Sequence, residues 1–184
     1  MLRISTLQLD KVEETDGVID WSGPTNRNWP VPDNVSSHSL GNPDSEGYLT
    51  VRPVTGALDA FRTLTLERKL RISIVSRLDR EPEWLPERVR RWVSHWGIDS
   101  YIPQNRIHFC YEFHEKRIFC ELMRPKFFVD DRLTVLRHLV GVVPHLFLFR
   151  PGPEDPRLWQ LVEDKKVHWV DSWEEVLATL AALI

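Results

Sequence analysis

The stretch Lys126-Phe127-Phe128-Val129-Asp130-Asp131-Arg132 joins a short apolar run to two adjacent carboxylates. Phe127, Phe128 and Val129 predict a buried strand, and a helical pattern starts directly after it. Two neighbouring carboxylates repel each other unless a cation or strong donors compensate, and Mg²⁺ is a common cation for clustered carboxylate oxygens. A second interpretation is that the aspartates cap the next helix, where Asp is favoured. Both interpretations place the aspartates where the strand ends.

Strands and helices alternate along the rest of the chain, outward from this stretch. Apolar patterns predict strands at 2–9, 70–75, 106–111, 127–129, 145–149 and 167–170, and helices after Gly56, at 82–96, at 115–123, after Leu133 and after Trp173. Such alternation favours right-handed crossovers and a mostly parallel sheet. We therefore expect an α/β fold, a three-layer Rossmann-like sandwich. Residues 20–55, which are rich in Pro, Asn, Ser, Gly and Asp, are expected to form an irregular excursion or flap.

Length and composition are those of a globular protein. The 184 residues predict a single domain spanning 1–184, and the net charge of −3 indicates no general affinity for nucleic acid or anionic membranes. No apolar stretch has the length of a membrane span, and the first ten residues lack the apolar segment of a signal peptide. Two cysteines make no disulfide framework, so we expect a cytoplasmic protein.

Polar side chains follow four of the predicted strands, at the sheet edge where α/β proteins bind ligands. Asp10 follows the first strand, with Glu14 and Asp16 soon after, and Ser76 follows the second. Lys116 comes after the third strand within His114-Glu115-Lys116, and the acidic pair comes after the fourth. Carboxylates suit Mg²⁺, while a hydroxyl and an ammonium suit an anion. The set indicates phosphoryl transfer, in which positioning and charge neutralisation do most of the work.

These residues resemble the four ordered motifs of the haloacid dehalogenase superfamily. Ile72-Ser73-Ile74-Val75-Ser76 is similar to its second motif, a strand that ends in Ser or Thr. His114-Glu115-Lys116 is similar to the third motif, a Lys at a helix start, and Phe127 to Arg132 is similar to the fourth, an acidic pair after an apolar strand. The resemblance covers roughly residues 50–150.

The first motif, an Asp nucleophile with a second Asp two residues later, has two registers here. In the first, Leu7-Gln8-Leu9 ends at Asp10, and Val12 occupies the position of the second Asp. In the second, Asp16-Gly17-Val18-Ile19 matches the family turn, so that Asp16 is the acid/base and Glu14 takes the nucleophile position. The second register buries Lys11 and Glu13 in a central strand, which is costly.

The resemblance implies an Mg²⁺-dependent phosphohydrolase with a minimal cap. Asp10 would be the nucleophile and an Mg²⁺ ligand, and Asp16 the acid/base, brought back toward Asp10 by a small local insertion. Ser76 and Lys116 would bind the phosphoryl group, Lys116 also acting in catalysis. Asp130 would ligate Mg²⁺, with Asp131 a ligand or an N-cap. The substrate would be a small phosphorylated molecule or a phosphorylated macromolecule, and in a homo-oligomer a partner subunit could close the open site.

Two alternatives follow from the degenerate first motif. One is a catalytically silent relative that binds a ligand or a partner protein. The other is a dehalogenase-like hydrolase, which needs the Asp nucleophile but neither Mg²⁺ nor the second Asp.

Two further clusters have simpler explanations than a site. His108 and Cys110, with Cys120, lack the four ligands at recognisable spacing that structural zinc needs. The arginines at 77, 80, 88, 90 and 91 could steer an anionic substrate, but such residues are expected on the polar face of the 82–96 helix.

Overall fold

One seven-stranded sheet organises the protein. The computed structural model describes residues 5–7, 17–21, 47–78, 83–152 and 155–183. Within them the strands are β1 (Ser5–Leu7), β2 (Gly17–Trp21), β3 (Ile72–Arg77), β4 (Ile107–Cys110), β5 (Phe127–Asp130), β6 (His145–Phe149) and β7 (His168–Val170). The strand order is β4-β3-β2-β5-β6-β7, and all neighbours in this order are parallel. The α/β class and its Rossmann-like parallel sheet therefore agree with the sequence prediction.

The helices follow the strands, and all of those described except α6 were predicted from the sequence pattern. They are α2 (Ala57–Arg62) with its π-helical continuation η2 (Thr63–Glu67), α3 (Leu85–His95), α4 (Glu115–Met123), α5 (Leu133–Leu136), α6 (Gln160–Glu163) and α7 (Trp173–Leu183). Short 3₁₀ turns lie at Gly47–Thr50, Ile98–Ser100, Gln104–Arg106 and Pro156–Trp159. Pro86 stands in the first turn of α3, where its missing N–H costs nothing. Gly97 ends the helix at a φ of 66°, a conformation that favours glycine.

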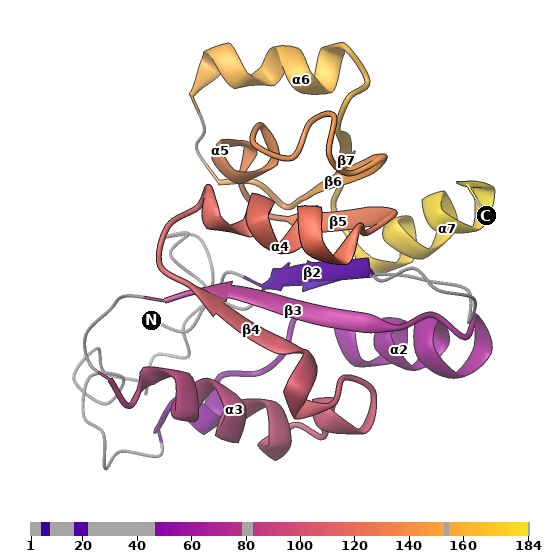
Figure 1. The fold of residues 1–184 in the computed structure, drawn as a ribbon. Helices are drawn as coiled ribbons and strands as arrows, with labels where there is room; N and C mark the ends of the chain where they lie inside the picture. The colour runs from indigo at the N-terminus through magenta and orange to yellow at the C-terminus, as the bar shows by residue number, and fades with distance from the viewer. Residues whose placement is uncertain (1–4, 8–16, 22–46, 79–82, 153–154, 184) are drawn as a thin grey trace.

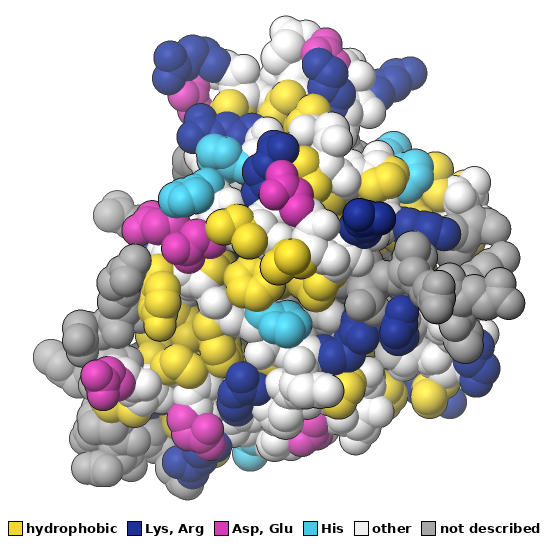
Figure 2. All heavy atoms as spheres, viewed as in Figure 1, with side chains coloured by type: hydrophobic (Ala, Val, Ile, Leu, Met, Phe, Trp, Pro, Cys, Tyr) yellow, Lys and Arg dark blue, Asp and Glu magenta, His cyan; other side chains and the backbone are white. Residues whose placement is uncertain are grey.

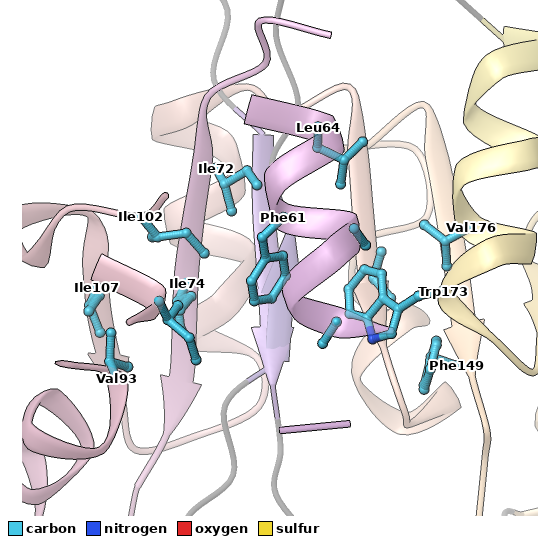
Figure 3. Packing of buried hydrophobic residues seen from close by; sticks show 14 of the residues in the cluster. Phe61, Leu64, Ile72, Ile74, Val93, Ile102, Ile107, Phe149, Trp173 and Val176 are labelled. Carbon is cyan, nitrogen blue, oxygen red and sulfur yellow. The ribbon is translucent and has the colours of Figure 1, made fainter. Parts of the chain in front are cut away.

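Alternation along the strands divides the buried side chains between two cores. Ile72 and Ile74 of β3 join the first core with Phe61 of α2, Val93 of α3 and Trp173 of α7. Figure 3 shows Phe61 and Trp173 close together, their ring centroids 5.5 Å apart.

The second core lies on the opposite face of the sheet. It takes Val75 of β3 and Phe128 of β5, together with Cys120 of α4 and Leu133 of α5. Helices thus cover both faces of the sheet (Figure 1).

The outer side of α4 is apolar. Ile118 and Leu122 lie four residues apart and are 53% and 78% exposed. Hydrophobic side chains gather over the centre of the face drawn in Figure 2, where Figure 1 places α4.

The central strand is β2, which the sequence analysis did not predict as a strand. Residues 2–9 were expected to form the first parallel strand, and this is wrong. The described part, β1, pairs antiparallel with β2, with Leu7 opposite Val18 and Ser5 opposite Trp21. β2 instead lies between β3 and β5 and is parallel to both. Its short apolar pair Val18-Ile19, followed at once by Asp20, gave too little periodicity to predict a strand.

Part of the expected excursion at 20–55 is regular structure. The end of β2 and the 3₁₀ turn Gly47–Thr50 both fall within that range. Residues 22–46 lie outside the described residues. None of the described helices has the length and the apolar character needed to cross a membrane.

Candidate functional site

The carboxyl ends of β2, β3 and β5 meet at one edge of the sheet. Ile19 of β2 pairs with Val129 of β5, so the next residues, Asp20 and Asp130, stand level with each other in adjacent strands. Gly17 pairs with Ile72, and the same register places Ser76 level with Trp21. α4 begins beside this edge, where β3 and β4 end (Figure 1). The edge is where parallel α/β sheets bind ligands.

Lys116 and Asp130 form a buried ion pair at this edge. The Lys116 Nζ donates to Asp130 Oδ2 at 3.2 Å, and neither side chain is accessible to solvent. The other carboxylate oxygen, Oδ1, accepts the backbone N–H of Arg132 at 2.9 Å. The lysine comes from the first turn of α4 and the aspartate from the last position of β5. The pair therefore joins a helix start to a strand end in the way that the sequence indicated.

Burial dominates the protonation of this pair. Desolvation lowers the pKa of Lys116, and the negative charge of Asp130 partly offsets that effect. Desolvation raises the pKa of Asp130, and Lys116, the Arg132 N–H and Asp131 oppose the rise. The two groups depend on each other for their charges, because an isolated charge in such a site is very costly.

Glu115 fixes the loop that delivers Lys116. Its Oε2 accepts the backbone N–H groups of Tyr111 at 2.7 Å and of Glu112 at 3.1 Å. The carboxylate also stands in the first turn of α4, where a negative charge is favoured by the helix dipole. The sequence analysis named Glu115 only as part of the third motif, and these hydrogen bonds give it a role in shaping the loop.

Ser76 lies at the same edge but on the other face of β3. The Ser76 side chain is fully buried, and strand alternation places it on the same face of the sheet as Ile72 and Ile74. Lys116 lies on α4, which covers the opposite face, the face of Val75. β2 separates β3 from β5. The structure thus brings Lys116 and Asp130 into contact, and it brings Ser76 to their edge of the sheet.

Asp130 and Asp131 were expected from the sequence to hold Mg²⁺, and in the structure both oxygens of Asp130 accept protein hydrogen bonds. Asp131 follows β5 directly and is half-buried. No three His, Cys, Asp or Glu side chains stand together as metal ligands in the part of the chain that the structure describes. Mg²⁺ is commonly held by only one or two protein carboxylates, completed by water and substrate phosphate. Asp130 would have to exchange one of its protein hydrogen bonds for the metal in that mode of binding.

The sequence analysis assigned the first motif to Asp10, Glu14 and Asp16. All three lie outside the residues that the structure describes. β2 brings a different aspartate, Asp20, to the edge that holds Asp130. The sequence analysis missed it. The available signal was an apolar pair that ends in an acid, followed by Ser22-Gly23-Pro24, a run typical of a turn.

The cysteines belong to the second core. Cys110 and Cys120 are free and buried, and burial raises the pKa of both thiols, to about 12 for Cys110. His108 packs its ring against Phe119, with the centroids 5.4 Å apart. These contacts explain the three side chains by packing, in line with the sequence interpretation.

The arginine cluster is only partly a solvated helix face. Arg88 is 5% exposed, and its guanidinium lies over the rings of Tyr48 and Trp84 at 4.1 and 5.0 Å. Arg90 donates to the carbonyl of Gln104 at 2.6 Å. The expectation of a polar face was therefore wrong for Arg88, because aromatic rings cover it.

Comparisons of this chain with protein-family models, curated proteins and solved structures found no match. The function is therefore inferred from the fold and from the geometry of its carboxyl edge.

Proposed function

We propose that the protein is an Mg²⁺-dependent phosphohydrolase of the haloacid dehalogenase type that acts on a phosphate ester. The observation that carries the proposal is the buried contact between Lys116 and Asp130 at the carboxyl edge, with Asp20 level with Asp130 in the adjacent strand. An ammonium held among carboxylates can neutralise a phosphoryl group while the carboxylates hold the metal. If this edge of the sheet had only a structural role, it would not require a buried lysine.

Asp20 is the preferred nucleophile in this proposal. Its carboxylate would attack phosphorus, forming an aspartyl-phosphate as the bond from phosphorus to the leaving oxygen breaks. Water would then hydrolyse the acyl-phosphate and return the carboxylate. Asp10 and Asp16 are the alternatives that the sequence offers for the nucleophile and the acid/base.

Lys116 would bind the phosphoryl oxygens, and Asp130 and Asp131 would hold Mg²⁺, whereas Ser76 lies on the other face of β3 and is given no contact with the phosphoryl group. When bound, the metal would supply positive charge opposite the transferring group. To take part, Lys116 would have to be uncovered, because its side chain is inaccessible to solvent in this structure, and it would then share its ammonium between Asp130 and a phosphoryl oxygen.

The residue two positions after Asp20 is Ser22, where phosphatases of this type carry the acid/base aspartate. A serine hydroxyl is a poor proton donor near neutral pH. General acid/base help is worth roughly 10²–10⁴-fold, so we expect slow turnover unless Asp16 or another carboxyl supplies the proton.

A catalytically silent binding protein is the second candidate. It is favoured by the engagement of both Asp130 oxygens, one by Lys116 and the other by the N–H of Arg132. A dehalogenase-like hydrolase is the third, and independence from Mg²⁺ would distinguish it.

Three single substitutions test the assignment: Asp20→Asn, Asp10→Asn and Asp16→Asn. Hydrolysis of an aryl phosphate and binding of fluoroberyllate, an acyl-phosphate mimic, are measured with and without Mg²⁺. We expect Asp20→Asn to abolish both. Asp10→Asn should leave both unchanged. Asp16→Asn should slow turnover but keep fluoroberyllate binding if Asp16 is the acid/base.

The outcomes separate the candidates. Loss of activity in Asp10→Asn, with Asp20→Asn fully active, would move the nucleophile to Asp10. Binding of fluoroberyllate without any turnover would support the silent binding protein. Wild-type protein that neither hydrolyses phosphate esters nor binds fluoroberyllate would refute the phosphohydrolase.

A further inference from the structure

The outer side of α4 carries an apolar pair beside a charged pair. Ile118 and Leu122 lie four residues apart, and Leu122 is the most exposed large hydrophobic side chain of the described residues. Arg117 and Glu121, one position before each of them, are also about half exposed. Scattered apolar side chains are normal on protein surfaces, but two on one helix face are a candidate contact. We call these four side chains the α4 face.

Folding of a single chain does not use the apolar pair. α4 packs on the second core through its other side, where Lys116 and Cys120 are inaccessible to solvent. Ile118 and Leu122 each come two positions later, which turns them about 200° around the helix axis. Hydrophobic side chains gather over α4 in Figure 2, and none of the described helices lies in front of α4 in Figure 1. The apolar pair would contribute to stability only if another apolar surface covered it.

The charged pair is held in a defined position. Arg117 Nε donates to Glu121 Oε1 at 2.7 Å, and Arg117 Nη1 donates to the carbonyl of His138 at 3.1 Å. An exposed pair of this kind contributes little to the stability of one chain. It does keep one positive and one negative charge at fixed places beside the apolar pair, which lowers the entropy lost when a partner binds.

The order of these residues is self-complementary. In a twofold-symmetric contact, residue i of one copy faces residue j of the other, and j faces i. The apolar pair and the charged pair each span four residues, and their midpoints differ by one residue, about 1.5 Å along the helix. One twofold axis across two antiparallel α4 helices therefore sets Ile118 against Leu122 of the second copy. The same axis sets Arg117 against Glu121 of the second copy.

We infer that the α4 face is a homodimer contact, in which α4 packs antiparallel against α4 of a second copy of this chain. A partner of different sequence would have to supply an apolar pair and the opposite order of charges, and this chain already supplies both. Antiparallel packing also sets the positive end of each helix dipole beside the negative end of the other. The inference goes beyond the proposed function and does not depend on it.

The contact is expected to be weak. The α4 face presents four side chains, whereas standard interfaces use about 20–30 residues on each side. We therefore expect a dissociation constant of roughly 10⁻⁵–10⁻⁴ M. Sedimentation equilibrium of the full chain, from about 10 µM to about 1 mM, covers this range and should show the average mass rising from one chain toward two.

Charge reversal gives the sharpest test of the antiparallel arrangement. Arg117→Glu makes both charged positions of the α4 face acidic, and Glu121→Arg makes both basic. Each variant alone sets like charges across the axis, so its dimer should be weakened at least about tenfold. An equal mixture of the two variants restores opposite charges at both contacts and should dimerise at least as well as the wild type. Both variants lose the pair within the helix, and mixing cannot repair that loss.

Matched controls separate the contact from general effects of charge and hydrophobicity. Arg157→Glu and Glu67→Arg change the net charge by the same amounts at exposed positions outside α4 and should leave the dissociation constant within about twofold. Leu122→Gln should weaken the dimer at least about tenfold, since it removes apolar surface from the contact. Leu66→Gln, at a side chain 52% exposed in η2, should not.

Three results would overturn the inference. A wild-type chain that stays monomeric at about 1 mM would leave the α4 face to a different protein. A dimer that none of the α4 variants weakens must use another surface. If each charge variant weakens the dimer but their mixture does not restore it, the antiparallel twofold arrangement is wrong. Phosphate ester hydrolysis and fluoroberyllate binding are measured separately, so each of these results leaves the proposed function to its own test.

Discussion

Replacing Lys116 with methionine tests the buried ion pair directly. Lys116 and Asp130 are both inaccessible, and the Nζ–Oδ2 distance is 3.2 Å. At that distance, with an effective dielectric constant of about 20, the attraction is about 5 kcal/mol. Methionine fills similar volume but leaves the Asp130 carboxylate without its cation. Breaking a buried pair in this way costs about 3–5 kcal/mol of the free energy of unfolding.

The assay is thermal unfolding in EDTA, so that no divalent metal replaces the lost ammonium. For a chain of this size, the expected cost lowers the melting temperature by roughly 6–20 °C. Lys166→Met is the matched control, because Lys166 pairs with Asp164 at 3.0 Å while its side chain is 50% exposed. Exposed pairs contribute little, so that variant should melt within about 2 °C of the wild type.

The double variant Lys116→Met/Asp130→Asn completes the cycle. Asp130→Asn alone leaves the Lys116 ammonium buried, whereas the double variant leaves no charge. We expect the loss in free energy of unfolding of the double variant to be smaller than the sum of the losses of the two single variants, by about 1–3 kcal/mol. A loss in Lys116→Met no larger than in Lys166→Met would refute the reasoning that the pair is buried and charged.

Three further predictions concern stability and reactivity. Cys110 and Cys120 should react with a disulfide reagent only as fast as the protein unfolds, since burial raises the pKa of both thiols. Reaction at the rate of a free thiol in native protein would contradict their burial. Burial and then His168 lower the pKa of His145, so the unfolded state binds the proton more readily. The free energy of unfolding should therefore fall as pH drops below about 6.5, and less steeply in His145→Gln, as urea titrations at several pH values would show. Gly56→Ala should lower the melting temperature by several degrees in a thermal scan, because φ is +83° and the new Cβ would lie 3.2 Å from Glu174 Oε1.

Much of the fold could be predicted because most strands have long apolar runs. The pattern around Phe127 placed β5 almost to the residue, and the helical spacing predicted α4 at its observed limits. Both elements carry their own signal in sequence, since each buries several consecutive or periodic side chains. The contact between Lys116 and Asp130 followed from these two placements.

The central strand could not be predicted in the same way. β2 spans five residues, with Gly17 at its start and Asp20 near its end, so its local pattern is weak. Its position depends on pairing with β3 and β5, which lie far away along the chain. Arg88 was also misjudged, because periodicity does not reveal that Tyr48 comes to cover a guanidinium. Long-range contacts decide both cases.

The position of β2 divides the sheet into two blocks that are separate in the chain. β3 and β4 form one block, while β5, β6 and β7 form the other, and β2 is the strand that joins them. The other five strands of the order β4-β3-β2-β5-β6-β7 come from residues 72–170. Each block can therefore form from nearby residues, and β2, from near the start of the sequence, joins the two blocks. Without β2, two inner strand edges would lose their partner and be open to pairing with other chains. The same geometry makes the protein suited to fragment complementation: a peptide carrying β1 and β2 could be supplied separately, and recovery of the sheet would coincide with the arrival of Asp20 opposite Asp130.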